Sequence, residues 1–475
     1  MGGMTDPVTE PGIVAAKPPS FLDSINWGQA LSSSQINVYF ATDGEVFDGK
    51  ASVGWNAYEV QQAMLAFAQF ANVCDVNFTI VTDQSEATLT LVNKEKAAGY
   101  LGYFNPPGTR NEGIGVMNQS GTGWDEDLPG TGGLEQGGYG FITMIHEFGH
   151  ALGMAHPHDG GGTSTIWQGV TGPFDSFGTF DLNQGIYTTM SYNDGWQLQP
   201  GGKNEALEYG WQGTMMGFDV AMLQELYGAN MDFATGNDVY EIADDNISGT
   251  FFACIWDAGG LDTITYSGAR NVTIDLRAAH LGFAEGSGGY ISFAKGVYGG
   301  FTIANGVVIE DATGGSGRDV IIGNEARNML VGNDGNDAMA GMGGRDTMMG
   351  GTGRDVLIGG AGADKLAGGA GSDAFVYQSL SESGISKGKY DRIIGFDGGA
   401  DLIDLRTLDA VAGTGADDAF SWIDTDRFNA VAGELRWADI GPGVLVSGDT
   451  DGDGAADFRI FLAGIASIAE GDFLM

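Results

Sequence analysis

The sequence predicts a multidomain chain of the α+β and all-β classes, in which an α+β domain precedes a parallel β-roll of nonapeptide repeats. Three observations lead to this prediction. Helical and strand patterns alternate up to about residue 228, the helical signal then disappears, and a nine-residue motif repeats from Gly314 onward. Such a short period is typical of coils in which each copy adds one short strand. The 475 residues are enough for two or three domains, each with its own core.

Residues 1–228 divide into a leader and one α+β domain. Residues 1–20 are rich in proline and polar side chains and are predicted to be a flexible leader or a propeptide. Residues 21–228 contain apolar patterns of both periods, which indicates an α+β domain. The patterns predict strands at 36–41, 78–82 and 87–92, and helices at 58–73, 139–152 and 215–226.

The second predicted helix carries the most specific motif of the chain, His146-Glu147-x-x-His150 followed by Gly153 and His156. On a helix, His146 and His150 lie on the same side and can share one metal ion. Gly153 can adopt the backbone angles that end the helix, so that the chain turns back and brings His156 to the same ion. Three neutral imidazoles with one open position are the pattern of a catalytic zinc site. Glu147 is within reach of a water bound to that metal.

The alternative interpretation is that these histidines are ordinary core or surface residues. The chain has only five histidines, and three of them form this motif. The extended spacing with a glycine and a third histidine rarely arises by chance, so the metal site is the favoured interpretation. His158 is expected in a loop near the site, and His280 at the surface or in ordinary packing.

Residues 229–313 are predicted to connect the α+β domain to the repeats through short strands, such as those at 263–266 and 272–276. Residues 314–376 then hold seven copies of the pattern G-G-x-G-x-D-x-U-x, where U is a large apolar residue. The glycines allow tight turns whose carbonyls can face an ion, the aspartate adds a carboxylate, and the apolar residue points inward. Two copies should complete one turn of a flattened coil, with Ca²⁺ between adjacent turns.

The repeats therefore predict several structural Ca²⁺ ions. The aspartates at position six are Asp319, Asp337, Asp346, Asp355, Asp364 and Asp373. The other candidate ligands in the repeats are Gly315, Gly317, Gly332, Asp334, Gly341, Gly343, Gly350, Gly351, Gly353, Gly359, Gly360, Gly362, Gly368, Gly369 and Gly371. The second copy departs from the pattern because Glu325 and Ala326 replace small turn residues and Asn328 replaces the aspartate. Its site is expected to be weaker or absent.

Residues 377–475 return to a strand pattern. Asp449, Asp451, Asp453 and Asp457 resemble the start of a helix–loop–helix calcium loop, but Ile460 stands at the twelfth position instead of glutamate. The flanking segments alternate like strands. The sequence thus predicts a hairpin loop that binds one Ca²⁺, with an ordinary polar turn as the alternative.

The composition disfavours several classes of protein. A formal charge of −41 argues against a nucleic-acid partner, because the chain would repel the phosphates. No stretch is long and apolar enough for a transmembrane helix, and the N-terminus lacks the pattern of a secretory signal. The chain is expected to be either cytosolic or exported by a route without such a signal. Cys74 and Cys254 are expected to be buried free thiols, with a single bridge as the alternative.

Together these motifs resemble the serralysin family of secreted bacterial zinc proteases, within the metzincins, and the resemblance covers nearly the whole chain after residue 20. Pro157 follows the third histidine, as is usual in that family, and residues 188–192, Thr-Thr-Met-Ser-Tyr, look like its Met-turn. The resemblance implies a metzincin-type N-terminal protease domain. It also implies that Met190 forms an apolar floor beneath the zinc and that Tyr192 is a zinc ligand able to move toward the transition state.

The resemblance further implies calcium ligands outside the repeats and an export route. Residues 256–262 resemble a calcium loop of the family, and the segment after the hinge at 226–230 resembles another. The ligands so implied are Ala234, Gly236, Asp238, Asp257, Gly259, Gly260, Asp262 and Glu310. The last residues look like the family's C-terminal signal for type I secretion through a dedicated transporter; they are Asp472, Phe473, Leu474 and Met475.

The expected function is that of a secreted, extracellular and monomeric endopeptidase that acts on proteins or peptides, with one catalytic Zn²⁺ and several structural Ca²⁺ ions. Glu147 would take a proton from the zinc-bound water and pass it to the leaving amine, and Tyr192 would help to stabilise the oxyanion. Two other functions stay open, a calcium-dependent surface-binding protein with a silent protease domain and a processing protease with one partner substrate. The complete set of ligands and base favours an active enzyme.

Overall fold

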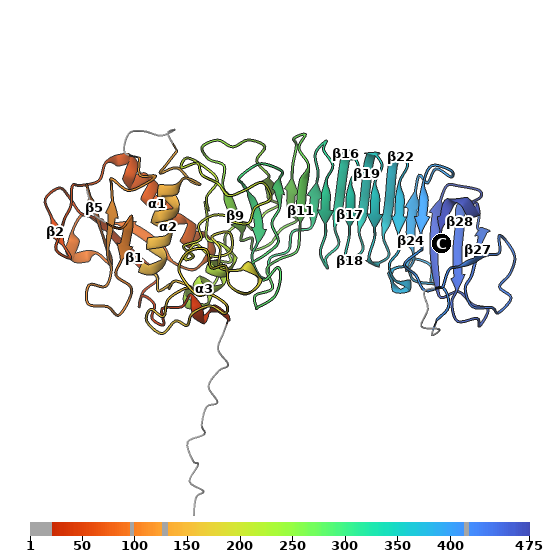
Figure 1. The fold of residues 1–475 in the computed structure, drawn as a ribbon, viewed down its shortest axis with the longest axis horizontal. Helices are drawn as coiled ribbons and strands as arrows, with labels where there is room; N and C mark the ends of the chain where they lie inside the picture. The colour runs from red at the N-terminus through yellow and green to blue at the C-terminus, as the bar shows by residue number, and fades with distance from the viewer. Residues whose placement is uncertain (1–20, 96–98, 126–131, 413–417) are drawn as a thin grey trace, which may run out of the picture.

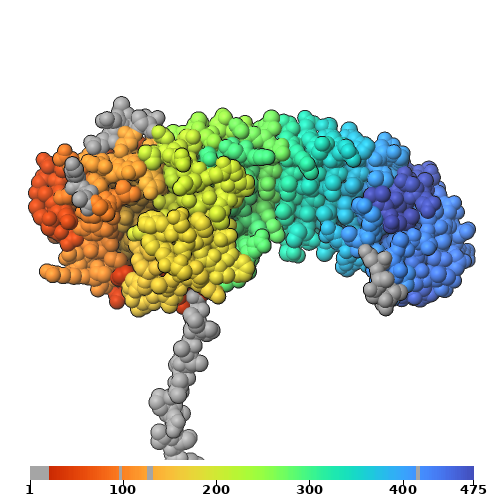
Figure 2. Space-filling model, viewed as in Figure 1, coloured from red at the N-terminus to blue at the C-terminus, as the bar shows by residue number. Residues whose placement is uncertain are grey.

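The computed structural model describes residues 21–95, 99–125, 132–412 and 418–475, so the predicted leader at 1–20 lies outside the described residues. The chain forms an elongated, mostly β molecule with few helices (Figure 1). The α-helices gather at one end, and a long stack of short strands leads from them to the C-terminal strands at the other end (Figure 1, Figure 2). None of the described helices is both long and apolar enough to cross a lipid bilayer.

The N-terminal region contains a five-stranded sheet of order β4-β1-β5-β7-β6, in which only the edge strand β6 is antiparallel to its neighbour. The strands are β1 (Gln35–Phe40), β4 (Asn77–Ile80), β5 (Leu89–Lys94), β6 (Gly102–Phe104) and β7 (Ile114–Asn118). The predicted strands at 36–41, 78–82 and 87–92 correspond to β1, β4 and β5. Strands β6 and β7 are not predicted, because their glycine-containing segments alternate over too few residues.

The α-helices are α1 (Ala57–Val73), α2 (Tyr139–Ala151) and α3 (Gly217–Tyr227), which confirms the three predicted helices to within two residues at each end. Helix α1 begins with a capping box in which Asn56 and Glu59 each accept a hydrogen bond from the other's backbone N–H. Phe67 of α1 stacks on Phe148 of α2, with ring centroids 3.9 Å apart. This contact fixes the helix that carries the histidine motif against α1.

Two further sheets run along the molecule and enclose a common core. Successive repeats alternate between them, and each strand pairs in parallel with the strand 18 residues later. Leu330 lies beside Met348 in one sheet, and Ile321 lies beside Met339 in the other. Because the repeat has nine residues, two copies complete one turn of the coil. The large apolar residues at position eight are all buried; they are Ile321, Leu330, Met339, Met348, Leu357, Leu366 and Phe375.

Both sheets extend beyond the repeats in each direction. The eleven-stranded sheet has the order β26-β27-β28-β29-β24-β22-β19-β16-β14-β10-β8, and the eight-stranded sheet has the order β12-β11-β15-β17-β20-β23-β25-β30. The strands of the first are β8 (Val239–Glu241), β10 (Thr263–Thr265), β14 (Asp311–Thr313), β16 (Met329–Asp334), β19 (Thr347–Gly353), β22 (Lys365–Gly371), β24 (Asp391–Ile394), β26 (Ser421–Trp422), β27 (Glu434–Asp439), β28 (Gly443–Asp449) and β29 (Phe458–Ala463). Those of the second are β11 (Val272–Asp275), β12 (Phe293–Ala294), β15 (Val320–Ile322), β17 (Ala338–Ala340), β20 (Val356–Ile358), β23 (Ala374–Val376), β25 (Leu402–Asp404) and β30 (Phe473–Leu474). Strands β10 and β11 confirm the predicted strands at 263–266 and 272–276.

Short pairs and turns complete the fold. The two-stranded pairs are β2 (Val46–Phe47) with β3 (Lys50–Ala51), β9 (Phe252–Ile255) with β13 (Gly300–Ile303), and β18 (Gly343–Gly344) with β21 (Ala361–Gly362). The 3-10 helices are η1 (Phe21–Ser24), η2 (Gln84–Glu86), η3 (Thr179–Asp181), η4 (Leu380–Glu382) and η5 (Glu470–Asp472). Cys74 and Cys254 are buried free thiols, so the alternative of a bridge between them is wrong. Burial raises the pKa of each thiol to about 12, which keeps both protonated.

Candidate metal centres

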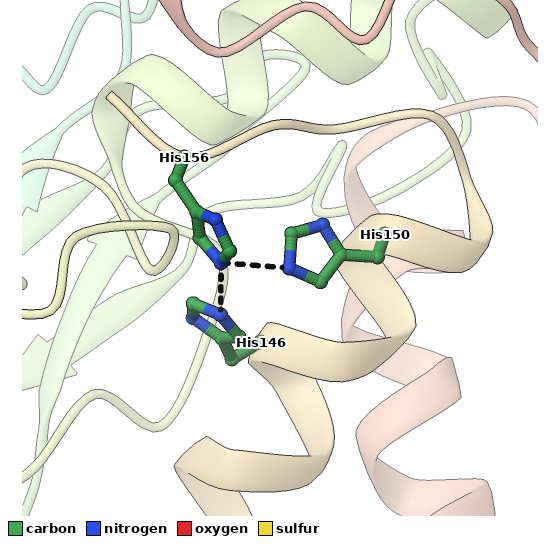
Figure 3. Close-up of side chains that lie close together, drawn as sticks. All are labelled: His146, His150 and His156. Carbon is green, nitrogen blue, oxygen red and sulfur yellow. Dashed lines mark hydrogen bonds between the residues drawn. The ribbon is translucent and has the colours of Figure 1, made fainter. Parts of the chain in front are cut away.

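Three imidazole rings from α2 and the turn that follows it meet at one point (Figure 3). His146 and His150 project from one face of the helix, and His156 comes from the turn. Nε2 of His156 lies 3.1 Å from Nε2 of His146 and 2.9 Å from Nε2 of His150. The structure therefore brings together the three predicted zinc ligands.

The turn after α2 depends on Gly153, whose φ of +94° is left-handed. A Cβ atom at this position would lie 2.2 Å from the carbonyl oxygen of Gln29. The backbone N–H of Trp27 also donates to the carbonyl oxygen of Gly153 at 2.9 Å. The segment before β1 can thus pack against the turn only because residue 153 is glycine, and this packing sets the position of the segment that leads to His156.

Two of the rings are oriented by backbone carbonyl oxygens. His146 Nδ1 lies 2.7 Å from the oxygen of Thr189, and His150 Nδ1 lies 3.0 Å from that of Met154. Because a carbonyl oxygen can only accept, both rings carry their proton on Nδ1 and turn the lone pair of Nε2 toward the common point. Burial and the neighbouring imidazoles hold the pKa of His146 well below its usual range and lower that of His150 to about 3. Both rings are therefore neutral at neutral pH.

Asp159 belongs to the site, although the motif does not include it. Its Oδ2 lies 2.9 Å from Nδ1 of His156, so it orients the third ring as the carbonyls orient the other two. The hydrogen bond to His156 lowers the pKa of Asp159 and keeps its carboxylate charged. Asp159 is absent from the sequence prediction; its place three residues after the last histidine is a signal that could have indicated it.

This donor set fits a zinc ion. Three neutral nitrogens that turn their lone pairs toward one another repel unless a cation lies between them. In a tetrahedral zinc site with bonds of about 2.0–2.1 Å, the ligand nitrogens lie about 3.3 Å apart, close to the separations measured here. In the part of the chain that the structure describes, the three histidines form a group of potential metal ligands whose nitrogens lie within 4.8 Å of one another.

Glu147 lies between two cavities that flank the imidazoles. It lines both the cavity of about 300 Å³ on the side of Phe174 and Asp194 and the cavity of about 540 Å³ on the side of Asp159. Burial raises the pKa of Glu147 to about 8. A Cβ atom on Gly102 of β6 would lie 2.9 Å from Cγ of Glu147. Strand β6 can therefore lie this close to Glu147 only because residue 102 is glycine.

The segment 188–192 passes beneath and beside the rings. Met190 is fully buried, and its Sδ lies 2.7 Å from the point where a Cβ on Gly149 would be, so it packs directly against α2. The ring centroid of Tyr192 lies 4.7 Å from that of His156. Burial raises the pKa of Tyr192 to about 12, so its hydroxyl keeps its proton. The predicted Met-turn residues therefore lie at the site.

Asp219, in the first turn of α3, holds this segment in place and is absent from the sequence prediction. Its carboxylate accepts hydrogen bonds from Oγ1 of Thr188 at 2.6 Å and from the backbone N–H of Thr189 at 2.7 Å. It also accepts from the N–H of Met216 at 3.0 Å. The carbonyl oxygen of Thr189 in turn accepts the hydrogen bond from Nδ1 of His146. Asp219 therefore positions the His146 ring indirectly, by holding Thr189 in place. An aspartate at a helix start usually caps only its own helix, so the sequence gives no signal of this role.

We expect Asp219→Asn to weaken both the fold and zinc binding. An asparagine has one accepting oxygen where aspartate has two, so it cannot accept all three hydrogen bonds, which costs about 1–3 kcal/mol of unfolding free energy. The looser segment should lower zinc affinity about 10–100-fold. Denaturant titration and zinc competition with a chelator measure the two effects. Asp232→Asn, at an exposed position after α3, is the control; unchanged zinc affinity in Asp219→Asn would contradict the positioning role.

The other two histidines lie where the sequence predicts. His158 is in the loop after His156, and its ring lies 4.9 Å from that of His156 and 4.5 Å from that of Tyr192. His280 is exposed, and its Nε2 lies 3.0 Å from the carbonyl oxygen of Glu285. Only the first of the two therefore borders the metal centre.

A first cluster of predicted calcium ligands joins the loops at 234–238 and 257–262. Asp238, Asp257 and Asp262 place carboxylate oxygens within 4.8 Å of one another, and Glu310 accepts the backbone N–H of Asp262. Within the described residues, Oδ2 of Asp238 and of Asp262 is buried without a hydrogen-bond partner. Burial raises the pKa of Asp262 to about 6. The remaining predicted ligands lie in the same two loops; they are Ala234, Gly236, Gly259 and Gly260.

A second cluster lies in the hairpin between β28 and β29, which confirms the predicted hairpin. Asp449, Asp451 and Asp453 bring carboxylate oxygens within 4.8 Å of one another. Asp457 lies outside this group; its Oδ2 accepts from the backbone N–H and the hydroxyl of Thr450, which closes the base of the loop.

The aspartates at position six of the repeats form two ladders. In one, the N–H of Asp319 donates to Oδ1 of Asp337, whose own N–H donates to Oδ1 of Asp355. The second ladder runs through Asp346 and Asp364 in the same way. One oxygen of each carboxylate thus accepts a hydrogen bond from the backbone of the neighbouring turn. Among the described residues, the other oxygen is buried without a hydrogen-bond partner in Asp337, Asp346, Asp355, Asp364 and Asp373.

Such rows of unpaired carboxylate oxygens are a donor set that suits a hard cation such as Ca²⁺. The predicted glycine ligands and Asp334 lie in the turns and at the strand ends beside the ladders. A Cβ atom on Gly353 would lie 1.5 Å from the carbonyl oxygen of Gly335. Adjacent turns can therefore stack this closely only because such contact positions are glycine. The residues present therefore fit several bound calcium ions.

Asn328 is the first member of the second ladder, because its backbone N–H donates to Oδ1 of Asp346. Its own side chain needs no cation. The amide oxygen of Asn328 accepts the N–H of Asn324, and its N–H₂ donates to the carbonyl oxygen of Glu310. Asn328 is therefore satisfied by the chain alone, which is the physical reason for the weaker site expected in the second copy.

Each ladder continues one step beyond the repeats. Asp391 accepts the N–H of Asp364, and Asp401 accepts the N–H of Asp373. Oδ2 of Asp391 is also buried without a hydrogen-bond partner in the described structure. The sequence prediction lacks both residues, because the spacing of 27 and 28 residues breaks the period of the repeat.

In calcium-free protein, we expect acid to stabilise the coil. Burial raises the pKa of Asp337 and Asp364 to about 6 and that of Asp346 to about 7. A carboxyl whose pKa is higher in the folded state favours folding while it is protonated, and this contribution is lost as the pH rises through the folded pKa. The unfolding free energy of the coil should therefore fall between about pH 4 and about pH 7. Denaturant titrations at a series of pH values check this; a coil that becomes more stable toward pH 7 would disprove it.

The C-terminal residues are part of the fold. Phe473 and Leu474 form β30, which pairs with β25, and Met475 packs against the core. Asp472 accepts the N–H groups of Gly399 and Ala469. The residues predicted as an export signal therefore close one end of the eight-stranded sheet.

Comparisons with known proteins show the family to which the chain is similar. The family described as Peptidase M10 serralysin C terminal matches residues 219–475. Serralysin C from Dickeya chrysanthemi is 34% identical over 318 residues, which cover 63% of this chain and 62% of that protein. Metalloprotease AprA from Pseudomonas entomophila (strain L48) is 33% identical over 431 residues, which cover 86% of this chain and 78% of that protein. The chain thus spans less than two thirds of the first relative and more than three quarters of the second.

Proposed function

Because this chain belongs to the serralysin family of zinc metalloendopeptidases, we propose that it is a secreted enzyme that hydrolyses peptide bonds in proteins. The observation that carries the proposal is the convergence of three neutral imidazoles beside the buried carboxyl group of Glu147. His146, His150 and His156 would hold one Zn²⁺. The two cavities that flank the rings give a peptide access from either side.

The metal and two neighbouring residues would have separate roles in peptide-bond hydrolysis. Bound by the three histidines, zinc would supply a Lewis acid for the attacking water and the scissile carbonyl. Glu147 would accept the proton of the attacking water and later donate it to the leaving amine. Tyr192, whose hydroxyl stays protonated, would donate a hydrogen bond to the developing oxyanion.

We further propose that the coil is a parallel β-roll stabilised by Ca²⁺ ions along its two aspartate ladders, with further ions at the two loop clusters. The buried, unpaired oxygens of the ladders support this assignment. Outside the cell, calcium concentrations of about 10⁻⁴–10⁻³ M would suffice to fill such sites. Inside the cell, where calcium is scarce, the carboxylates would repel one another and favour an unfolded chain, which suits export through a type I transporter.

Casein hydrolysis by the purified protein in calcium tests the proposed function. The enzyme should cleave casein, lose this activity when phenanthroline removes the zinc, and regain it when zinc is added back. A folded, zinc-loaded protein that leaves casein and a mixture of denatured proteins intact would rule out a broad endopeptidase.

A further inference from the structure

The cavity on the Phe174 side of the metal centre combines apolar walls with a carboxylate. It measures about 300 Å³, and both His146 and Glu147 line it, so a side chain bound there lies next to the reacting peptide bond. Its apolar and aromatic lining is formed mainly by Leu101, Tyr139, Ile142, Phe174 and Tyr192. Among the described residues of the lining, Asp194 is the one acidic residue besides Glu147.

Asp194 has no ion-pair partner in the described part of the chain. The hydroxyl of Tyr139 donates to its Oδ2 at 3.1 Å, and this is its only side-chain hydrogen bond there. An adjoining cavity of about 350 Å³ shares Tyr139, Phe174 and Asp194 with the first and adds a second carboxylate, Glu205. No described lysine or arginine lines either cavity.

We propose that this cavity binds the side chain of a lysine or arginine next to the scissile bond, and that Asp194 determines this specificity. The inference rests on the proposed endopeptidase function. Substrates would then be proteins with accessible basic residues, which the acidic enzyme, with a formal charge of −41, also attracts at long range.

The shape and chemistry of the cavity suit a long basic side chain. The methylene groups of a lysine or arginine can pack on Leu101 and Ile142 while the charged end extends further. The faces of Tyr139 and Phe174 favour a cation in their neighbourhood. At the end of the side chain, the charge would pair with Asp194, whose carboxylate otherwise has no cationic partner.

Apolar or acidic side chains of a substrate fit the cavity less well. A leucine would cover the apolar wall but would exclude water from Asp194 without giving the carboxylate a partner, which is unfavourable. A glutamate would meet repulsion from both Asp194 and Glu205. The cavity should therefore discriminate by charge as well as by size.

Matched fluorogenic peptides test the inference. The peptides differ at one residue, which is arginine, citrulline or glutamate. In one set this residue lies just before the scissile bond, and in the other set just after it. Mass spectrometry identifies the bond that is cleaved. Citrulline has the length and hydrogen-bonding shape of arginine without its charge. The wild type should cleave the arginine peptide of one set about tenfold faster than its citrulline counterpart, measured as kcat/KM. The ratio within one preparation is independent of how much of the protein is active.

Variants then assign the preference to one carboxylate. Asp194→Asn should reduce the arginine-to-citrulline ratio to about one, and Asp194→Lys should favour the glutamate peptide over the arginine peptide. Asp43→Asn, at an exposed position outside both cavities, should keep the wild-type ratio. A wild-type ratio near one in both peptide sets, or an unchanged ratio in Asp194→Asn, would overturn the inference while casein cleavage still supports the endopeptidase. A wild type that cleaves neither casein nor any peptide would overturn both.

Discussion

Glu147→Gln should retain its zinc and lose about 10²–10⁴-fold in kcat. Glutamine has nearly the same size as glutamate, and the three imidazoles are oriented by Thr189, Met154 and Asp159 instead of by residue 147. The substitution therefore removes the proton acceptor and leaves the metal ligands in place. Zinc content by elemental analysis and peptide hydrolysis on the same sample measure the two effects.

The matched control for this substitution is Glu86→Gln, in the exposed turn η2 of the same domain. It should leave both zinc content and activity at the wild-type level. Near-normal peptide cleavage by zinc-loaded Glu147→Gln would contradict the assignment of Glu147 as the general base. Loss of zinc from Glu147→Gln would instead mean that the carboxylate helps to hold the metal.

Removal of calcium should unfold the coil before the α+β region. Each ion that binds only the folded coil contributes about 2–3 kcal/mol at a free concentration about 100 times its dissociation constant. Without the ions, the unpaired oxygens of Asp337, Asp355 and the other ladder members remain buried next to like charges. The helices α1 and α2 pack through buried apolar side chains that need no ion, among them the stacked rings of Phe67 and Phe148.

Two signals should change together when calcium is chelated. The β-sheet circular dichroism should fall, and the hydrodynamic radius should rise, while the amide hydrogen exchange of α1 and α2 changes little. Addition of calcium should reverse both changes, whereas an equal concentration of magnesium, which prefers a tighter octahedral site, should not. Unchanged circular dichroism and radius in chelator would contradict calcium as the stabilising element.

Residues with a strict local period could be predicted from the sequence. His146, His150 and Gly153 mark the helix and its end, and the apolar residues at position eight of the repeats mark the two faces of the coil. Both patterns follow from the geometry of a single element, so that no knowledge of distant contacts is needed.

Residues that act through the tertiary fold could not be predicted in this way. Asp219 reaches the metal centre only because α3 packs beneath the segment 188–192. Asp391 and Asp401 join the ladders across spacings that do not match the repeat. Asp194 borders the cavity because the chain after Tyr192 passes Tyr139 of α2. In each case the sequence neighbours carry no pattern, and the contact depends on how distant segments pack.

Anomalous X-ray scattering at the zinc absorption edge, from crystals of the zinc-loaded protein, would locate the catalytic metal ion. We expect one strong peak about 2.0–2.1 Å from Nε2 of each of His146, His150 and His156. A zinc peak at another position, or no peak between these three rings in protein that has been loaded with zinc, would contradict the proposed zinc site.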